Sequence, residues 1–212
     1  MFYPEMQPDH PYNAEIINSL INEEKKHQRN GVCIFNIDDV KRLQSTTRTQ
    51  EFKETYRNNV VGNINSLVFP LEETTDNEIE KHINLVHAEP SGQILTIYGK
   101  KPENSDTSTD LEQHASELCR KIFRKNGCSI DKFETEWKNG FTSNGAADCA
   151  VLAIEEMKIL ARKKKIEEKE YTQHEIKTCR LKHILEIEDL HKDKMIRRVS
   201  KRPSATVYKH YM

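Results

Sequence analysis

Two neighbouring apolar segments in the middle of the chain constrain its fold most. They run from Lys81 to Pro90 ("KHINLVHAEP") and from Gly92 to Lys100 ("GQILTIYGK"). Both are rich in Ile, Leu, Val and Tyr, which favour strands, and "EPSG" between them supplies turn residues. We therefore predict a β-hairpin.

The part of the chain before this hairpin contains one predicted helix and two predicted strands. The helix spans Asn13–Arg29, because its isoleucines and leucine recur on one face. A short strand is expected around Val32–Ile34 and a longer one over Asn65–Glu73. Pro70 is expected to end the longer strand or to place it on an edge. Between these strands, residues 38–60 show no clear preference for helix or loop.

The part after the hairpin is predicted to be mainly helical. A helix is expected over Thr109–Lys125, with Thr109 or Asp110 as its N-cap. A short strand is predicted within Cys128–Trp137, and two further helices over Asp148–Lys169 and Tyr171–His191. In the first of these two helices the apolar face ends near Leu160, so the rest of it must be solvated or must meet a charged partner.

These elements together predict an α+β fold, a small mixed sheet flanked by helices. We expect residues 1–160 to form the α/β core and residues 161–212 to form a helical, basic C-terminal region that packs on it. The core must be modest, because 35% of the residues are hydrophobic and 32% are charged.

Bulk composition also argues against several classes of function. The net charge of −1 gives no global basic field for nucleic acid. No apolar run approaches the roughly 20 residues that a membrane span needs. The five cysteines are irregularly spaced and none forms a Cys-x-x-Cys pair, so we expect reduced thiols, an intracellular working environment and no metal site. The N-terminus lacks the pattern of a secretory signal.

Cys149 is the first candidate for chemistry. It lies in "SNGAADCAVLAIEEMK" (Ser143–Lys158), where a polar, glycine-containing loop turns into a helix. A thiol at a helix N-terminus is exposed to the positive end of the helix dipole, which favours the nucleophilic thiolate. The alternative is a small apolar residue in a buried first turn.

His82 is the second candidate, because it begins the first strand of the hairpin. Its ring would lie at the edge of the sheet, where a helix carrying a cysteine can dock and form a Cys–His pair. His87 lies five residues further on and would face the opposite side of the strand, so the two rings do not share a metal. The alternative for His82 is a surface histidine.

The order of these segments resembles the YopJ family of bacterial effector acetyltransferases, which has the fold of the ubiquitin-like-protein cysteine proteases (clan CE). The hairpin "HINLVHAEPSGQILTIYG", the cysteine segment with Asp148 before Cys149, and the final "ATVYKHYM" carry the resemblance. It implies that Cys149 takes acetyl from acetyl-CoA as a thioester, with His82 as general base. The acceptor would be a Ser, Thr or Lys of a host signalling protein, after secretion by a bacterium into the host cytoplasm.

The chain departs from this family at two positions beside the expected site. Gly99 stands where the family has an acid that orients the histidine, so Glu103 or Asp106 in the following loop is the candidate substitute. The family also carries a glutamine upstream of the cysteine as an oxyanion donor. Asn144 is the candidate for that role here, through its side-chain amide.

The resemblance further implies inositol hexakisphosphate as an activator bound by basic residues. Arginine and lysine clamp phosphate oxygens, and the C-terminal region is rich in both. The candidate cradle consists of Arg197, Arg198, Lys201, Arg202, Lys209 and His210, with Arg162, Lys163, Lys164 and Lys165 as additions. The alternative is a solvated basic tail.

Two other functions remain open. The first is a ubiquitin- or SUMO-like cysteine protease that uses the same Cys149 and His82. Ile83 stands where those proteases have a Trp, and this, with the basic tail, favours the transferase. The second is a catalytically inactive binding module, for which Gly99 and the missing glutamine are the motivation.

Overall fold

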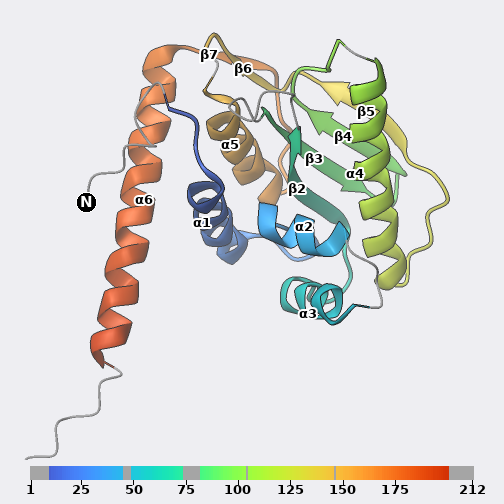
Figure 1. The fold of residues 1–212 in the computed structure, drawn as a ribbon, viewed down its shortest axis with the longest axis horizontal. Coiled ribbons are helices and arrows are strands. Elements are labelled where there is room, and N and C mark those ends of the chain that lie inside the picture. Colours follow the sequence, from blue (N-terminus) through green and yellow to red (C-terminus); the bar gives the residue numbers. More distant parts are fainter. Residues whose placement is uncertain (1–9, 45–48, 74–81, 104, 146, 201–212) are drawn as a thin grey trace, which may run out of the picture.

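The computed structural model describes residues 10–44, 49–73, 82–103, 105–145 and 147–200 (Figure 1). Its centre is a sheet in the order β1-β2-β3-β4-β5. The outer pairs β1–β2 and β4–β5 are parallel and the inner pairs are antiparallel, so the sheet is mixed. The strands are β1 (Val32–Ile34), β2 (Ser66–Glu73), β3 (His82–Glu89), β4 (Ile94–Tyr98) and β5 (Glu134–Lys138). The predicted α+β fold with a small mixed sheet is confirmed.

The predicted hairpin forms β3 and β4, with Leu85 opposite Tyr98 and Glu89 opposite Ile94. The predicted first helix is α1 (Ala14–Glu24), and a short 3-10 turn, η2 (Lys25–His27), continues it. Asn13 caps α1 by accepting a hydrogen bond from the Ile16 amide at 2.9 Å. Local sequence patterns were sufficient for these elements.

Pro70 lies inside β2 rather than at its end. Proline has no N–H to donate to a neighbouring strand, so it is tolerated only where the strand has no neighbour on that side. β1 ends at Ile34, which lies opposite Val68, so β2 continues past its neighbour and is locally an edge at Pro70. The short β1 is therefore what allows a proline in a strand that elsewhere has a neighbour on each side.

Helices cover both faces of the sheet (Figure 1). One core contains side chains of α1, α5 (Cys149–Ala161) and α6 (Gln173–Ser200) together with Val68, Leu85 and Tyr98 of the sheet. The other contains side chains of α2 (Ile37–Gln44), α3 (Gln50–Asn59) and α4 (Ser105–Lys125) together with Phe69 and Val86. Adjacent residues of one strand, such as Leu85 and Val86, thus enter different cores, as strand alternation requires.

Three predicted helix boundaries are wrong, and one is the end of the last helix, which runs to Ser200 instead of His191. α4 begins at Ser105, one turn before the predicted caps Thr109 and Asp110. The sequence pattern misses this first turn because it is polar and lacks apolar periodicity. α5 (Cys149–Ala161) ends well before Lys169, and Lys163 just beyond it has a φ of 55°, in the left-handed region. The charged segment that follows is therefore not helical.

A second, two-stranded parallel sheet is completed by the strand after that break. It pairs β6 (Phe141–Ser143) with β7 (Lys169–Tyr171), strands too short to predict from the sequence. α6 (Gln173–Ser200) then packs against α1 and α5 through Ile176, Cys179 and Ile187. Within the described residues, no helix is both long and apolar enough to cross a bilayer.

Candidate active site

Cys149 and His82 are in contact. α5 begins at Cys149 and buries Ala150, Val151 and Leu152 in the core on one face of the sheet, so its first turn lies at the start of β3. The half-buried sulfur of Cys149 is hydrogen bonded to the His82 ring and to the backbone N–H of Ile83. The helix N-terminus and the strand start thus meet as the sequence predicts.

The pKa values of the two groups move toward the thiolate–imidazolium pair. Burial raises the pKa of the Cys149 thiol, but hydrogen bonds from the His82 ring and from the amides of Ile83 and Ala150 outweigh it, and the pKa lies below the ordinary value. The hydrogen bond to Cys149 raises the pKa of His82, against the opposing effect of burial. A charged pair of this kind keeps a nucleophilic sulfur at neutral pH.

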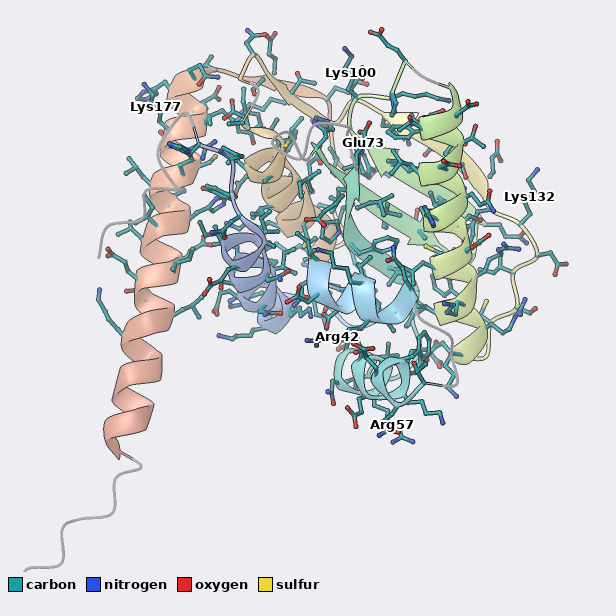
Figure 2. All side chains as sticks on the ribbon, viewed as in Figure 1. Arg42, Arg57, Glu73, Lys100, Lys132 and Lys177 are labelled. Atoms are coloured by element: carbon teal, nitrogen blue, oxygen red, sulfur yellow. The ribbon has the colours of Figure 1, made fainter. Side chains whose placement is uncertain are left out.

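Glu73 is the carboxylate that acts most on His82. It lies directly opposite His82 in the β2–β3 register, so both side chains are on one face of the sheet. Its charge raises the pKa of His82 further, while that of Lys100 lowers it. Figure 2 shows Glu73 and Lys100 at the same end of the sheet.

The two carboxylates predicted to orient the imidazole lie on the surface. The Glu103 side chain is 91% exposed and forms an ion pair with Lys100 at 3.8 Å. Asp106 is exposed in the first turn of α4. The charges with the largest effects on His82 are those of Cys149, Glu73 and Lys100, so the structure places neither predicted acid behind the ring.

The predicted oxyanion donor also lies on the surface. The Asn144 side chain is exposed, and its amide nitrogen is 3.5 Å from the Glu170 carboxylate of β7. The neighbouring Ser143 hydroxyl donates to Asp148 at 2.8 Å. The structure therefore directs the Asn144 amide at Glu170 rather than at Cys149.

The loop that carries Cys149 is fixed by a buried arginine that sequence reasoning missed. Arg180 of α6 is 2% exposed; it donates to the Ala147 carbonyl at 2.9 Å and to the Asp148 carboxylate at 3.2 Å. Asp148 also accepts hydrogen bonds from Ser143 and from Gln173 at 3.1 Å. This network fixes the residues just before the nucleophile candidate.

His183 is a second buried polar side chain of α6, and it also connects α6 to other parts of the core. The His183 ring lies between the Tyr12 hydroxyl, at 3.1 Å, and the Glu155 carboxylate of α5, at 3.0 Å. Arg180 and His183 could have been found from the sequence, because they lie between two isoleucines at the three- and four-residue spacing of one buried helix face. This face comprises Ile176, Arg180, His183 and Ile187, all buried.

The predicted polyphosphate cradle lies largely outside the described side chains. Arg197 and Arg198 belong to the end of α6, and Lys201, Arg202, Lys209 and His210 lie outside the described residues. Of the additional basic run, Arg162 forms an ion pair with Glu24 of α1 at 2.6 Å, and Lys163, Lys164 and Lys165 are exposed. Inositol hexakisphosphate binding stays a prediction. In the described part of the chain, no group of three His, Cys, Asp or Glu side chains is arranged to hold a metal.

Comparisons with known proteins bear on the fold. No protein-family model and no curated protein matches the sequence. Among solved structures, the yeast Ulp1 protease domain in complex with Smt3, the yeast ortholog of SUMO, aligns with a TM-score of 0.62 and 12% identity, covering 88% of this chain and 80% of that one. XopD, an effector of Xanthomonas campestris bound to ubiquitin, aligns at 0.54 and 12%, covering 86% and 97%.

A third similar structure is the catalytic domain of the Ulp1-like SUMO protease of Chaetomium thermophilum. It aligns with a TM-score of 0.53 and 14% identity, covering 84% of this chain and 72% of that one. The chain thus has the Ulp1-like cysteine protease fold that the sequence resemblance implies. None of these similar structures is named as a YopJ acetyltransferase, so membership of that family is not shown.

Proposed function

We propose that this protein is a Cys–His hydrolase that cleaves the amide bond formed by the C-terminal carbonyl of a ubiquitin-like modifier. The observation that supports it most is the contact between Cys149 and His82, with pKa values shifted toward the charged pair. The fold adds the substrate class, because the similar Ulp1 and XopD structures are complexes with Smt3 and with ubiquitin.

The chemistry follows from the charges of the pair. The Cys149 thiolate attacks the scissile carbonyl carbon, and a C–S bond forms while the C–N bond breaks. His82, as imidazolium, gives its proton to the departing amine. Water then attacks the thioester carbonyl and gives one proton to His82, and the C–S bond breaks to restore the thiolate. The modifier leaves as a carboxylic acid, which loses the second proton to solvent and becomes a carboxylate.

The N-terminus of α5 supports the same chemistry electrostatically. The positive end of a helix dipole favours negative charge, both on the sulfur and on an oxyanion that develops beside it. Asp148 precedes this turn, but its charge is paired with Arg180 at 3.2 Å. Its ion pair with Arg180 limits the repulsion that a free carboxylate there would exert on the thiolate.

An electrophilic probe tests the proposal. Ubiquitin and SUMO carrying a C-terminal electrophile should each be incubated with the protein, and the adduct mapped by mass spectrometry. We expect an adduct on Cys149 with at least one modifier and none after Cys149→Ala. The matched control is Cys128→Ala, which removes another half-buried thiol and should leave labelling unchanged.

A parallel incubation separates the transferase hypothesis from the hydrolase. Labelled acetyl-CoA is added with and without inositol hexakisphosphate. Acetyl on Cys149 without any modifier adduct would contradict the hydrolase and favour acetyl transfer to a host protein. Neither adduct nor acetyl, with a folded protein, would favour the inactive binding module.

A further inference from the structure

Asn84 is a buried polar side chain without a partner beside the proposed site. It is fully buried, and within the described part of the chain neither its amide nitrogen nor its carbonyl oxygen makes a hydrogen bond. Buried polar groups are nearly always hydrogen bonded, since an unpaired one has lost its water without compensation. A buried side chain with both polar atoms unpaired therefore needs an explanation.

Its place in the sheet points to His82. Asn84 follows His82 by two residues in β3, so both side chains lie on the same face of the sheet as neighbours along the strand. The His82 ring uses one nitrogen for the hydrogen bond to Cys149. Once the ring becomes an imidazolium, its other N–H needs an acceptor on this face.

Gly99 makes the room that Asn84 occupies. A Cβ built at position 99 would overlap Oδ1 of Asn84, and the φ of 147° at Gly99 is one that other residues rarely adopt. An acidic side chain projecting from position 99 and the present Asn84 conformation are therefore mutually exclusive. The glycine and the buried amide form one arrangement in which the polar group on this face comes from β3 instead of from the end of β4.

We propose that Asn84 is a positioning residue for His82. Its Oδ1, which has no partner in this conformation, becomes the acceptor for the imidazolium N–H that faces away from Cys149. This inference rests on the proposed function and names how its histidine is oriented. An amide acceptor fixes the plane of the imidazolium ring without adding charge, and the charge comes from Glu73 across the β2–β3 pair. Glu73 acts on the ring through its charge, without a hydrogen bond to it, so it leaves the orienting role open.

Two substitutions of similar shape separate positioning from packing. Asn84→Leu removes both unpaired polar atoms, and Asn84→Asp keeps the acceptor and adds a charge. The measurements are the rate of Cys149 alkylation by iodoacetamide against pH and the urea midpoint of unfolding.

We expect Asn84→Leu to unfold at the same or a higher urea concentration, yet to be alkylated at least about tenfold more slowly at pH 7. In Asn84→Asp, alkylation should be as fast as in the wild type and its high-pH limb should move upward. An Asn84→Leu protein that is folded and alkylated at the wild-type rate would overturn the proposal.

A double-mutant cycle and a wild-type measurement cover the case in which Asn84→Leu does not fold. Gly99→Ala should slow alkylation in the wild-type background, by displacing the amide, and should have no further effect with Asn84→Ala. Equal effects in both backgrounds would contradict the proposal. In the wild type at neutral pH, nitrogen-15 NMR of the His82 ring should show a hydrogen-bonded, exchange-protected N–H on the nitrogen that faces away from Cys149, and an N–H there that exchanges as fast as an exposed one would also overturn the proposal.

Failure of this inference can be told from failure of the proposed function, because alkylation needs no substrate. A wild-type thiol that is no more reactive than an ordinary one, and indifferent to His82→Ala, would overturn both. A reactive thiol that depends on His82 but not on Asn84 would overturn the positioning role alone.

Discussion

At the residue scale, the hydrogen bond between Cys149 and His82 sets the reactivity of the site. Burial alone would make Cys149 an ordinary inert thiol, and the donors around it reverse that effect. Cys119 shows the contrast, since burial without such donors raises its pKa far above the ordinary value. The environment rather than the residue type therefore distinguishes the candidate nucleophile from the other cysteines.

Removing the imidazole should abolish this difference. In His82→Ala we expect alkylation of Cys149 at pH 7 to fall by about tenfold or more, and its pH profile to move upward, because the thiolate loses its largest stabilising partner. His87→Ala is the matched control, since His87 contacts Ser66 at 2.8 Å and alternation places it on the other face of β3. Alkylation that is equally fast in wild type and His82→Ala would contradict the assignment.

The charge of Glu73 should also affect this pH profile, through the pKa of His82. The charge of Glu73 raises the pKa of His82, so Glu73→Gln should lower that pKa. The charged pair is lost when the His82 ring gives up its proton, so the pH at which it is lost should move downward, while the ionisation of Cys149 changes less. Titration of the His82 ring by NMR measures this, and Glu103→Gln, which removes an exposed carboxylate, should leave the titration unchanged.

At the element scale, α6 holds the start of α5 through Arg180. Breaking a buried ion pair leaves an uncompensated charge, at a cost of about 3–5 kcal/mol. We expect Arg180→Met to reduce the free energy of unfolding by about this amount, measured by urea titration, because Asp148 is equally buried. Asp148→Asn in the same protein should restore part of the loss, and an additive double mutant would show that the pair is not coupled.

The contact between α5 and β6 should make stability depend on pH. Burial raises the pKa of Glu156 from 4.5 to about 8, although the Phe141 amide donates to it at 2.7 Å. A raised pKa means that the folded protein binds the proton more tightly, so this contribution is complete below pH 4.5 and is lost as pH rises toward 8. Glu156→Gln should remove the decline and stabilise the protein at pH 8 by up to about 4 kcal/mol in urea titrations, and an unchanged slope would refute this origin.

The sequence predicts elements with strong local patterns and misses those set by distant contacts. The hairpin and α1 are predictable because alternation and capping are local, whereas the pairing of Cys149 with His82 is predicted only from the order of segments on which the family resemblance rests. The end of α5 and the strands β6 and β7 are not predictable, since they depend on a left-handed residue and on a pairing across the chain. The same holds in the site, where Glu73, Asn84 and Arg180 acquire their roles only through strand register and helix packing.

At the scale of the whole molecule, the C-terminal helix is part of the core that supports the site. Arg180 and His183 of α6 are buried against the Cys149 loop, Tyr12 and α5. Ile176, Cys179 and Ile187 of the same helix belong to the core that contains α1 and α5. The region that the sequence marks as a basic extension therefore includes a structural element of the catalytic-like core.

Two truncations separate this element from the basic residues beyond it. A chain ending at Tyr171 should lose cooperative unfolding and the near-ultraviolet circular dichroism of a packed core, because it leaves Asp148 without Arg180 and uncovers apolar side chains of α1 and α5. A chain ending at Ser200 should unfold like the full-length protein and keep its rate of Cys149 alkylation, since the described contacts of the site lie before that residue. A folded, reactive protein that ends at Tyr171 would show that α6 is dispensable, because the loop before Cys149 would then be held without Arg180.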